Sequence, residues 1–172
     1  MQSISIRLAA SADAGLLAEL GERTLRDTFP GGDESDTAAF VAANFGRDIL
    51  AAELQDARQR YLIAERGRVA VAFAQVQDGA AAPGVPGERP LKLARLYVDR
   101  PHIGTGVGAA LMARCLELAR AGGHDVVWLT VYEHGARAIA FYERWGFTIV
   151  GEMYFEFGSE RPRNLVLALR VA

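Results

Sequence analysis

The segment Gly104-Thr105-Gly106-Val107-Gly108 constrains this chain most, because it follows a strand-like run and leads into a helical pattern. Glycine lets the backbone approach a ligand closely, so that successive amide hydrogens can converge on one anion. A helix that begins at this point adds about half a positive charge at its N-terminus. The segment predicts either an anion-binding loop or a plain tight turn between strand and helix, and the loop alone does not separate the two.

Two nucleotide-binding motifs offer other interpretations of the loop. A P-loop is excluded because it requires a lysine that the loop lacks. A dinucleotide-binding fingerprint is matched by Gly104, Gly106 and Ala109. Glu133 stands at the end of the next predicted strand, where that motif places its ribose-binding acid. However, Asp99 to Ile103 separates the first strand from the loop, and too few residues follow for a doubly wound sheet. A NAD-binding oxidoreductase is therefore the weaker alternative.

Apolar periodicity predicts the order of the secondary-structure elements. Strands are expected at residues 4–8, 61–65, 69–73, 91–98, 126–132, 147–157 and 165–170. Helices are expected after a cap at Ser11 or Asp13, around 40–45 and 49–54, from 107 to the glycines at 122–123, and at 136–145. This order predicts one α/β domain over residues 1–172, built on a mixed sheet.

The composition excludes several classes of protein. A net charge of −2 gives no basic field for a nucleic-acid backbone, and no apolar run is long enough for a membrane span or a signal peptide. We therefore expect a cytoplasmic protein without nucleic-acid or membrane partners. The single cysteine, Cys115, excludes an intrachain disulfide, and its spacing to the three histidines predicts no metal site.

A second pattern lies about 35 residues beyond the glycine loop. From Ala138 to Phe147 the chain reads Ala-x-x-Phe-Tyr-x-x-x-Gly-Phe, directly after a strand that ends at Tyr132. Together with Leu96-Tyr97-Val98 and the glycine loop, this pattern resembles the two cofactor-binding motifs of the GNAT N-acetyltransferases. Residues 24–29 and 128–133 look most like those of bacterial spermidine/spermine N-acetyltransferases.

The resemblance implies an α/β fold with a mixed, mostly antiparallel twisted sheet, flanking helices and a central β-α-β unit that binds acetyl-coenzyme A as co-substrate. It implies that the backbone of Tyr97 and Val98 pairs with the pantetheine arm, and that the amides from Gly104 to Ala109 hold the pyrophosphate. The cofactor-binding residues that it assigns are Tyr97, Val98, Ile103, Gly104, Thr105, Gly106, Val107, Gly108, Ala109, Gly135, Ala138, Phe141 and Arg144.

By the same resemblance, Tyr142 is the general acid that protonates the departing coenzyme A thiolate. A phenol with a pKa near 10 can assist a thiolate whose thiol has a pKa near 8.5. Taken alone, Phe141-Tyr142 on an amphipathic helix would instead be ordinary core. Arg144 either reaches the cofactor phosphates or is a solvated helix residue. We expect direct attack in a ternary complex, because Cys115 lies on a helix face typical of core.

This chain departs from the family pattern at three places. Ile103 stands where Gln or Arg is usual, and Gly135 stands where asparagine is common. Lys92 and Ala94 replace acids often found on the strand before the loop, which leaves the general base unassigned. The candidate bases are Glu65, Glu133, His134 and Glu152.

The expected acceptor is a primary amine of a small molecule or polyamine. Candidate acceptor-binding residues are Asp27, Phe29, Glu34 and Glu133, although loop acids are often merely solvated. The missing polar groups leave a second interpretation, a regulatory domain that binds acyl-coenzyme A without catalysis. Edge strands near the C-terminus allow a homodimer.

Overall fold

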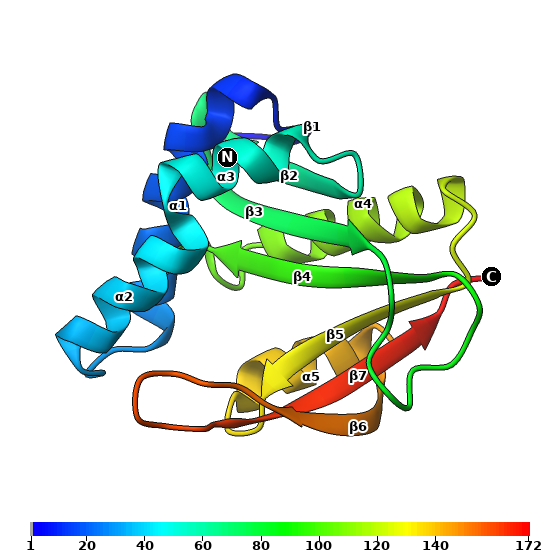
Figure 1. Ribbon diagram of the computed structural model, residues 1–172. Coiled ribbons are helices and arrows are strands. Elements are labelled where there is room, and N and C mark those ends of the chain that lie inside the picture. Colours follow the sequence, from blue (N-terminus) through cyan, green and yellow to red (C-terminus); the bar gives the residue numbers. More distant parts are fainter. Residues whose placement is uncertain (1) are drawn as a thin grey trace. The chain divides into compact units, whose positions relative to one another are not determined.

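The computed structural model describes residues 2–172 and contains the elements in the predicted order (Figure 1). The strands are β1 (Ile4–Leu8), β2 (Gln59–Arg66), β3 (Val69–Asp78), β4 (Pro90–Val98), β5 (Val126–Tyr132), β6 (Thr148–Tyr154) and β7 (Arg163–Arg170). The helices are α1 (Ala14–Thr28), α2 (Glu34–Phe45), α3 (Arg47–Gln55), α4 (Val107–Ala121) and α5 (Ala136–Arg144), with short 3-10 turns at Ser11–Asp13 and Arg100–His102.

The strands follow the order β1-β2-β3-β4-β5-β7-β6 in a mixed sheet. Strands β4 and β5 run parallel and are connected through α4, whereas β1–β2, β5–β7 and β6–β7 are antiparallel. The predicted α/β class with a central β-α-β unit is therefore confirmed. The parallel ladder covers only Pro90–Lys92 opposite Val126–Trp128, so Leu93–Val98 of β4 lies outside it.

The chain forms two compact units. One contains the described residues up to Val76 together with Arg95–Cys115, and the other contains Gln77–Ala94 and Leu116–Ala172. Strand β4 thus begins in the second unit and ends in the first.

In the first unit, α1, α2 and α3 lie beside β2 and β3 (Figure 1). An aromatic cluster is part of the core of this unit. The ring of Phe73, fully buried on β3, lies 6.2 Å from Phe45, 6.3 Å from Tyr61 and 5.6 Å from Tyr97. Phe45 reaches this position because Gly21 of α1 has no side chain: a Cβ there would come within 2.3 Å of the Phe45 ring. The cluster fixes the end of β4, where Tyr97 lies.

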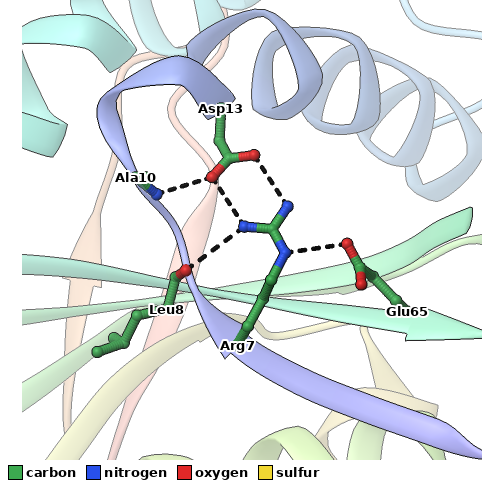
Figure 2. Close-up of polar contacts among 5 residues, drawn as sticks. All are labelled: Arg7, Leu8, Ala10, Asp13 and Glu65. Atoms are coloured by element: carbon green, nitrogen blue, oxygen red, sulfur yellow. Dashed lines mark hydrogen bonds and ion pairs between the residues drawn. The ribbon is translucent and has the colours of Figure 1, made fainter. Parts of the chain in front are cut away.

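Arg7 of the edge strand β1 joins the start of α1 to strand β2 (Figure 2). Its guanidinium donates to both carboxylate oxygens of Asp13 at 2.9 Å and to Glu65 of β2 at 3.0 Å. Asp13 precedes α1 as predicted, but its side chain does not cap that helix; it accepts the Ala10 N–H at 2.7 Å instead. The Arg7 hydrogen bonds lower the pKa of the Asp13 carboxyl.

In the second unit, β5 pairs along its whole length with β7, and Figure 1 shows α5 behind these strands. Most of β5 is buried, as its apolar run predicts. Asp125 precedes this strand and accepts the N–H groups of Glu88 and Arg89, which holds the preceding loop and lowers the pKa of the Asp125 carboxyl. Strand β6 is shorter than expected: it ends at Tyr154, and the chain then turns through an isolated bridge between Phe157 and Glu160.

We predict that Gly21→Ala destabilises the protein although alanine favours a helix interior by about 1 kcal/mol. The added methyl group must displace the buried Phe45 ring, and overpacking of a core costs about 1–3 kcal/mol. Gly15→Ala on the same helix is the matched control, because its methyl group would meet only the flexible end of Arg47. Urea unfolding of both variants measures the difference. Equal stability of the two would contradict a tight contact at Gly21.

We predict that Arg7→Met lowers the free energy of unfolding by about 1 kcal/mol at pH 7, the upper range for a partly exposed ion-pair group. The pKa of Asp13 is lower in the folded protein than in the unfolded chain, so its stabilisation is present above the unfolded value of 3.8. That stabilisation is lost as the pH falls through the folded pKa, and the difference from wild type should shrink. Arg58→Met removes an exposed ion pair with the nearby Asp56. It should change the free energy of unfolding little, both at pH 7 and below the folded pKa of Asp13.

Candidate functional site

The strand that leads to the glycine loop is fastened immediately after its last residue. The backbone N–H of Asp99 donates to the Val71 carbonyl at 2.8 Å, and the Asp99 carboxylate accepts two hydrogen bonds of 2.8 Å from Arg23 of α1. The half-buried Tyr97 packs against the aromatic cluster, and burial raises the pKa of its phenol. Tyr97 and Val98 therefore present their backbone from a fixed strand end.

The glycine loop lies between β4 and α4, where the sequence predicts it. Gly104 and Gly106 have φ angles of +78° and +91°, and no heavy atom lies within 4 Å of a Cβ built at either residue. Glycine is required there by the backbone conformation and not by crowding. The buried Val107 begins α4, whose first backbone hydrogen bond runs from Ala110 N–H to the Gly106 carbonyl at 3.0 Å. The amides of residues 106–109 thus have no intrahelical acceptor.

Ile103, Gly108 and Ala109 complete the predicted loop. Ile103 is half-buried, and its N–H donates to the Arg100 carbonyl at 3.3 Å. Because its side chain is a hydrocarbon, it brings neither a charge nor a hydrogen-bond donor to the loop. Gly108 is half-buried and Ala109 exposed on the first turn of α4. The loop contains no cationic side chain of its own.

A cation nevertheless contacts the loop, and sequence reasoning missed it. Arg66, at the end of β2, donates to the carbonyl and the hydroxyl of Thr105 at 3.2 and 3.1 Å. The Thr105 hydroxyl is therefore engaged in hydrogen bonds with other residues of the protein. No local pattern could have revealed this contact, because the two residues are 39 positions apart.

In the second unit, the residues assigned from the family pattern cluster on α5. Gly135 is the N-cap residue of α5, and Ala138 and Phe141 are half-buried on it. Tyr142 is 9% exposed, with its ring 5.4 Å from Phe141 and 5.8 Å from Phe147. Arg144 lies exposed in the last turn.

Glu133 follows the end of β5 and belongs to a charged cluster. One carboxylate oxygen lies 3.1 Å from Arg163 Nε, and the other lies 3.6 Å from His134 Nε2. Arg163 also pairs with Glu152 of β6 at 3.1 Å. The sequence brought out the two glutamates and the histidine but not Arg163, which comes from β7.

An open cavity of about 370 Å³ lies beside this cluster. Its lining residues are Tyr132, Glu133, Tyr154, Glu160, Arg161, Pro162 and Arg163. Arg161 pairs with Glu156 at 3.3 Å and lies over the Tyr154 ring, whereas Glu160 makes no ion pair in the part of the chain that the structure describes. The lining contains as many glutamates as arginines, and the ion-paired Glu152 and Glu156 beside it bring the glutamates to four against two arginines.

The other candidates lie in the first unit. Asp27 and Phe29 are exposed at the end of α1, and Glu34 pairs with Arg26 at 2.9 Å. Glu65, a candidate base, is engaged by Arg7. Cys115 is fully buried, and burial raises the pKa of its thiol to about 12, so it is a core residue as predicted.

Residues 2–172 contain neither a helix able to span a membrane nor a cluster of metal-ligating side chains. None of their helices combines the length and the apolarity that crossing a bilayer requires. Across the same residues, His, Cys, Asp and Glu side chains form no group of three or more suited to a metal ion.

Comparison with known proteins gives consistent matches. A sequence profile described as the Acetyltransferase (GNAT) family matches residues 22–147. An uncharacterized N-acetyltransferase of Mycobacterium tuberculosis is 32% identical over 156 residues, which cover 90% of this chain and 96% of that protein. Another, from Lactobacillus delbrueckii subsp. lactis, is 28% identical over 170 residues, 97% of each chain.

Solved structures show the same fold. The PaiA N-acetyltransferase of Thermoplasma acidophilum in complex with coenzyme A superposes with a TM-score of 0.79 at 18% identity, covering 98% of this chain and 99% of that chain. The ribosomal-protein-S18-alanine N-acetyltransferase of Escherichia coli gives a TM-score of 0.70 at 22% identity, with 99% and 95% covered. At these identities the likeness concerns the fold alone.

Proposed function

This chain belongs to the acetyltransferase (GNAT) family, and from that premise we propose that it acetylates a primary amine of a small cationic molecule by direct attack in a ternary complex. Family membership makes it an N-acetyltransferase with acetyl-coenzyme A as acetyl donor, and it decides against the NAD-binding alternative. The observation that carries the proposal is the glycine loop, whose amides at residues 106–109 have no intrahelical acceptor at the start of α4.

The cofactor would be held mainly by backbone groups. In our proposal the amides from Gly104 to Ala109 bind the pyrophosphate, each charge-assisted hydrogen bond contributing about 1.5–3 kcal/mol. The backbone of Tyr97 and Val98 pairs with the pantetheine arm. This is supported by the ladder between β4 and β5, which ends at Lys92 and leaves that part of β4 outside it.

Tyr142 would protonate the coenzyme A thiolate as it leaves. Its ring is held by Phe141 and Phe147, which restricts where the hydroxyl can point, as a general acid requires. The proposal includes no acetyl-cysteine intermediate, because the only cysteine is buried and its thiol pKa is raised to about 12.

Glu133 would bind the ammonium form of the acceptor, and a base would then deprotonate that ammonium group. The cavity beside Glu133 has space for a small amine, and Glu152 and Glu156, which pair with the two lining arginines, leave more carboxylates than arginines around it, which favours a cation. An alkylammonium with a pKa of about 10.4 costs roughly 4–5 kcal/mol to deprotonate at pH 7, so a base is useful. His134, whose Nε2 lies 3.6 Å from the Glu133 carboxylate, would be the base. A polyamine, which carries several such ammonium groups on one chain, belongs to this class of acceptor.

Tyr142→Phe should lower kcat at least about 100-fold while leaving coenzyme A affinity unchanged, because only the proton donor is lost. Steady-state kinetics and ligand-induced thermal shift measure the two quantities. Full turnover by this variant would reduce Tyr142 to a core residue. A wild-type protein that binds acetyl-coenzyme A but acetylates no amine would support the regulatory interpretation.

Glu133→Gln should raise KM for cationic amines by about 10–100-fold, which corresponds to the loss of one charge-assisted hydrogen bond. KM for acetyl-coenzyme A should stay unchanged. Glu143→Gln, an exposed carboxylate on α5, is the matched control. A panel of monoamines, diamines and polyamines would rank the acceptors, and absence of turnover with every di- and polyamine would eliminate the polyamine version.

A further inference from the structure

The contact between Arg66 and Thr105 organises the glycine loop from outside. Arg66 Nη2 donates to the Thr105 carbonyl at 3.2 Å and to its hydroxyl oxygen at 3.1 Å. The same hydroxyl donates to the His102 carbonyl at 2.7 Å, and the Thr105 N–H donates to that carbonyl at 3.3 Å. Thr105 is therefore held on both sides, by a strand 39 positions earlier in the chain and by the turn that precedes the loop.

This contact sets the direction of one loop amide. The Thr105 carbonyl and the Gly106 N–H belong to one planar trans peptide, in which the two groups point in opposite directions. By holding the carbonyl, Arg66 directs the Gly106 N–H away from itself. Gly106 has open space around its Cβ position, so hydrogen bonds and not packing keep this peptide in place.

Arg66 also brings a positive charge that the loop lacks. Among residues 2–172, no carboxylate forms an ion pair with its guanidinium, and its Nε is buried without a hydrogen-bond partner. Other arginines of the first unit, such as Arg7 and Arg23, pair with carboxylates. An unneutralised cation that contacts a loop without cationic side chains favours an anion there.

We propose that Arg66 is a positioning residue for the cofactor pyrophosphate: it fixes the Thr105–Gly106 peptide and supplies the positive charge that Ile103 does not. The inference rests on the proposed role of the glycine loop. It assigns to β2 a function in cofactor binding that the loop sequence does not carry.

The test compares Arg66→Gln and Arg66→Lys with Arg68→Ala, an exposed arginine two positions along the β2–β3 turn. Arg66→Gln should raise the Kd for coenzyme A and the KM for acetyl-coenzyme A about tenfold, with kcat within about twofold of wild type. It should also weaken the dependence of KM on salt. Arg66→Lys should recover the salt dependence but only part of the affinity, because lysine lacks the forked geometry. Arg68→Ala should match wild type.

S-acetylpantetheine, which has no phosphates, separates this role from general damage to the fold. Arg66→Gln should use it as well as wild type does; an equal loss on both donors, or an unchanged KM for acetyl-coenzyme A, would overturn the inference. If Arg66→Gln melts early without ligand, Thr105→Val serves instead, since it removes only the hydroxyl and should give a smaller loss of the same kind. Gly106→Ala distinguishes the two proposals: unchanged coenzyme A binding in that variant would reject the loop as the pyrophosphate site, whereas weakened binding there with normal binding in Arg66→Gln would reject only the role of Arg66.

Discussion

The aromatic cluster around Phe73 is the constraint on which the position of the glycine loop depends. Tyr97, Phe45 and Tyr61 surround that ring from a strand, a helix and a second strand. Each such ring pair contributes about 0.5–1.5 kcal/mol beyond the area it buries, so the end of β4 is fixed by packing. Asp99, the residue after β4, is then held by hydrogen bonds to the Val71 carbonyl and from the Arg23 guanidinium. The loop can consist of glycines with open surroundings because the structure on either side of it is rigid: the cluster before it and the buried Val107 after it.

The charged cluster after β5 is held by ion pairs and not by aromatic packing. Arg163 lies between Glu133 and Glu152 with side chains that are partly exposed, and ion pairs of this kind contribute little to stability. What they provide is orientation, because a carboxylate held by a guanidinium samples fewer rotamers than a free one. A site that must select a cation gains from carboxylates already held in place, since the cost of ordering them is met during folding and not on binding.

Local sequence predicted the elements well because their signals are local. The apolar run of β5 and the glycines between β4 and α4 are signals that depend on neighbouring residues. Pairings between distant residues carry no such signal. Asp13 stood at the expected helix start, yet its carboxylate went to Arg7 and Ala10.

The same limit explains which site residues were missed. Periodicity places a residue on a face but does not name its partner, so Arg66 and Arg163 stayed hidden while the residues they hold, Thr105 and Glu133, were identified. Glu34 shows the same limit, because its partner Arg26 lies eight positions earlier, on α1.

Placing the cation on β2 changes what the loop can do. An arginine at position 103 would extend from the loop itself and pay side-chain entropy each time it ordered around a phosphate. Arg66 is already ordered by Thr105, so its charge acts without a further loss of freedom. Half-buried Ile103 adds apolar packing where the family usually has a polar side chain. In the proposed site the loop would therefore separate two tasks: its backbone amides would direct the hydrogen bonds to the pyrophosphate, and the Arg66 guanidinium outside the loop would supply the positive charge.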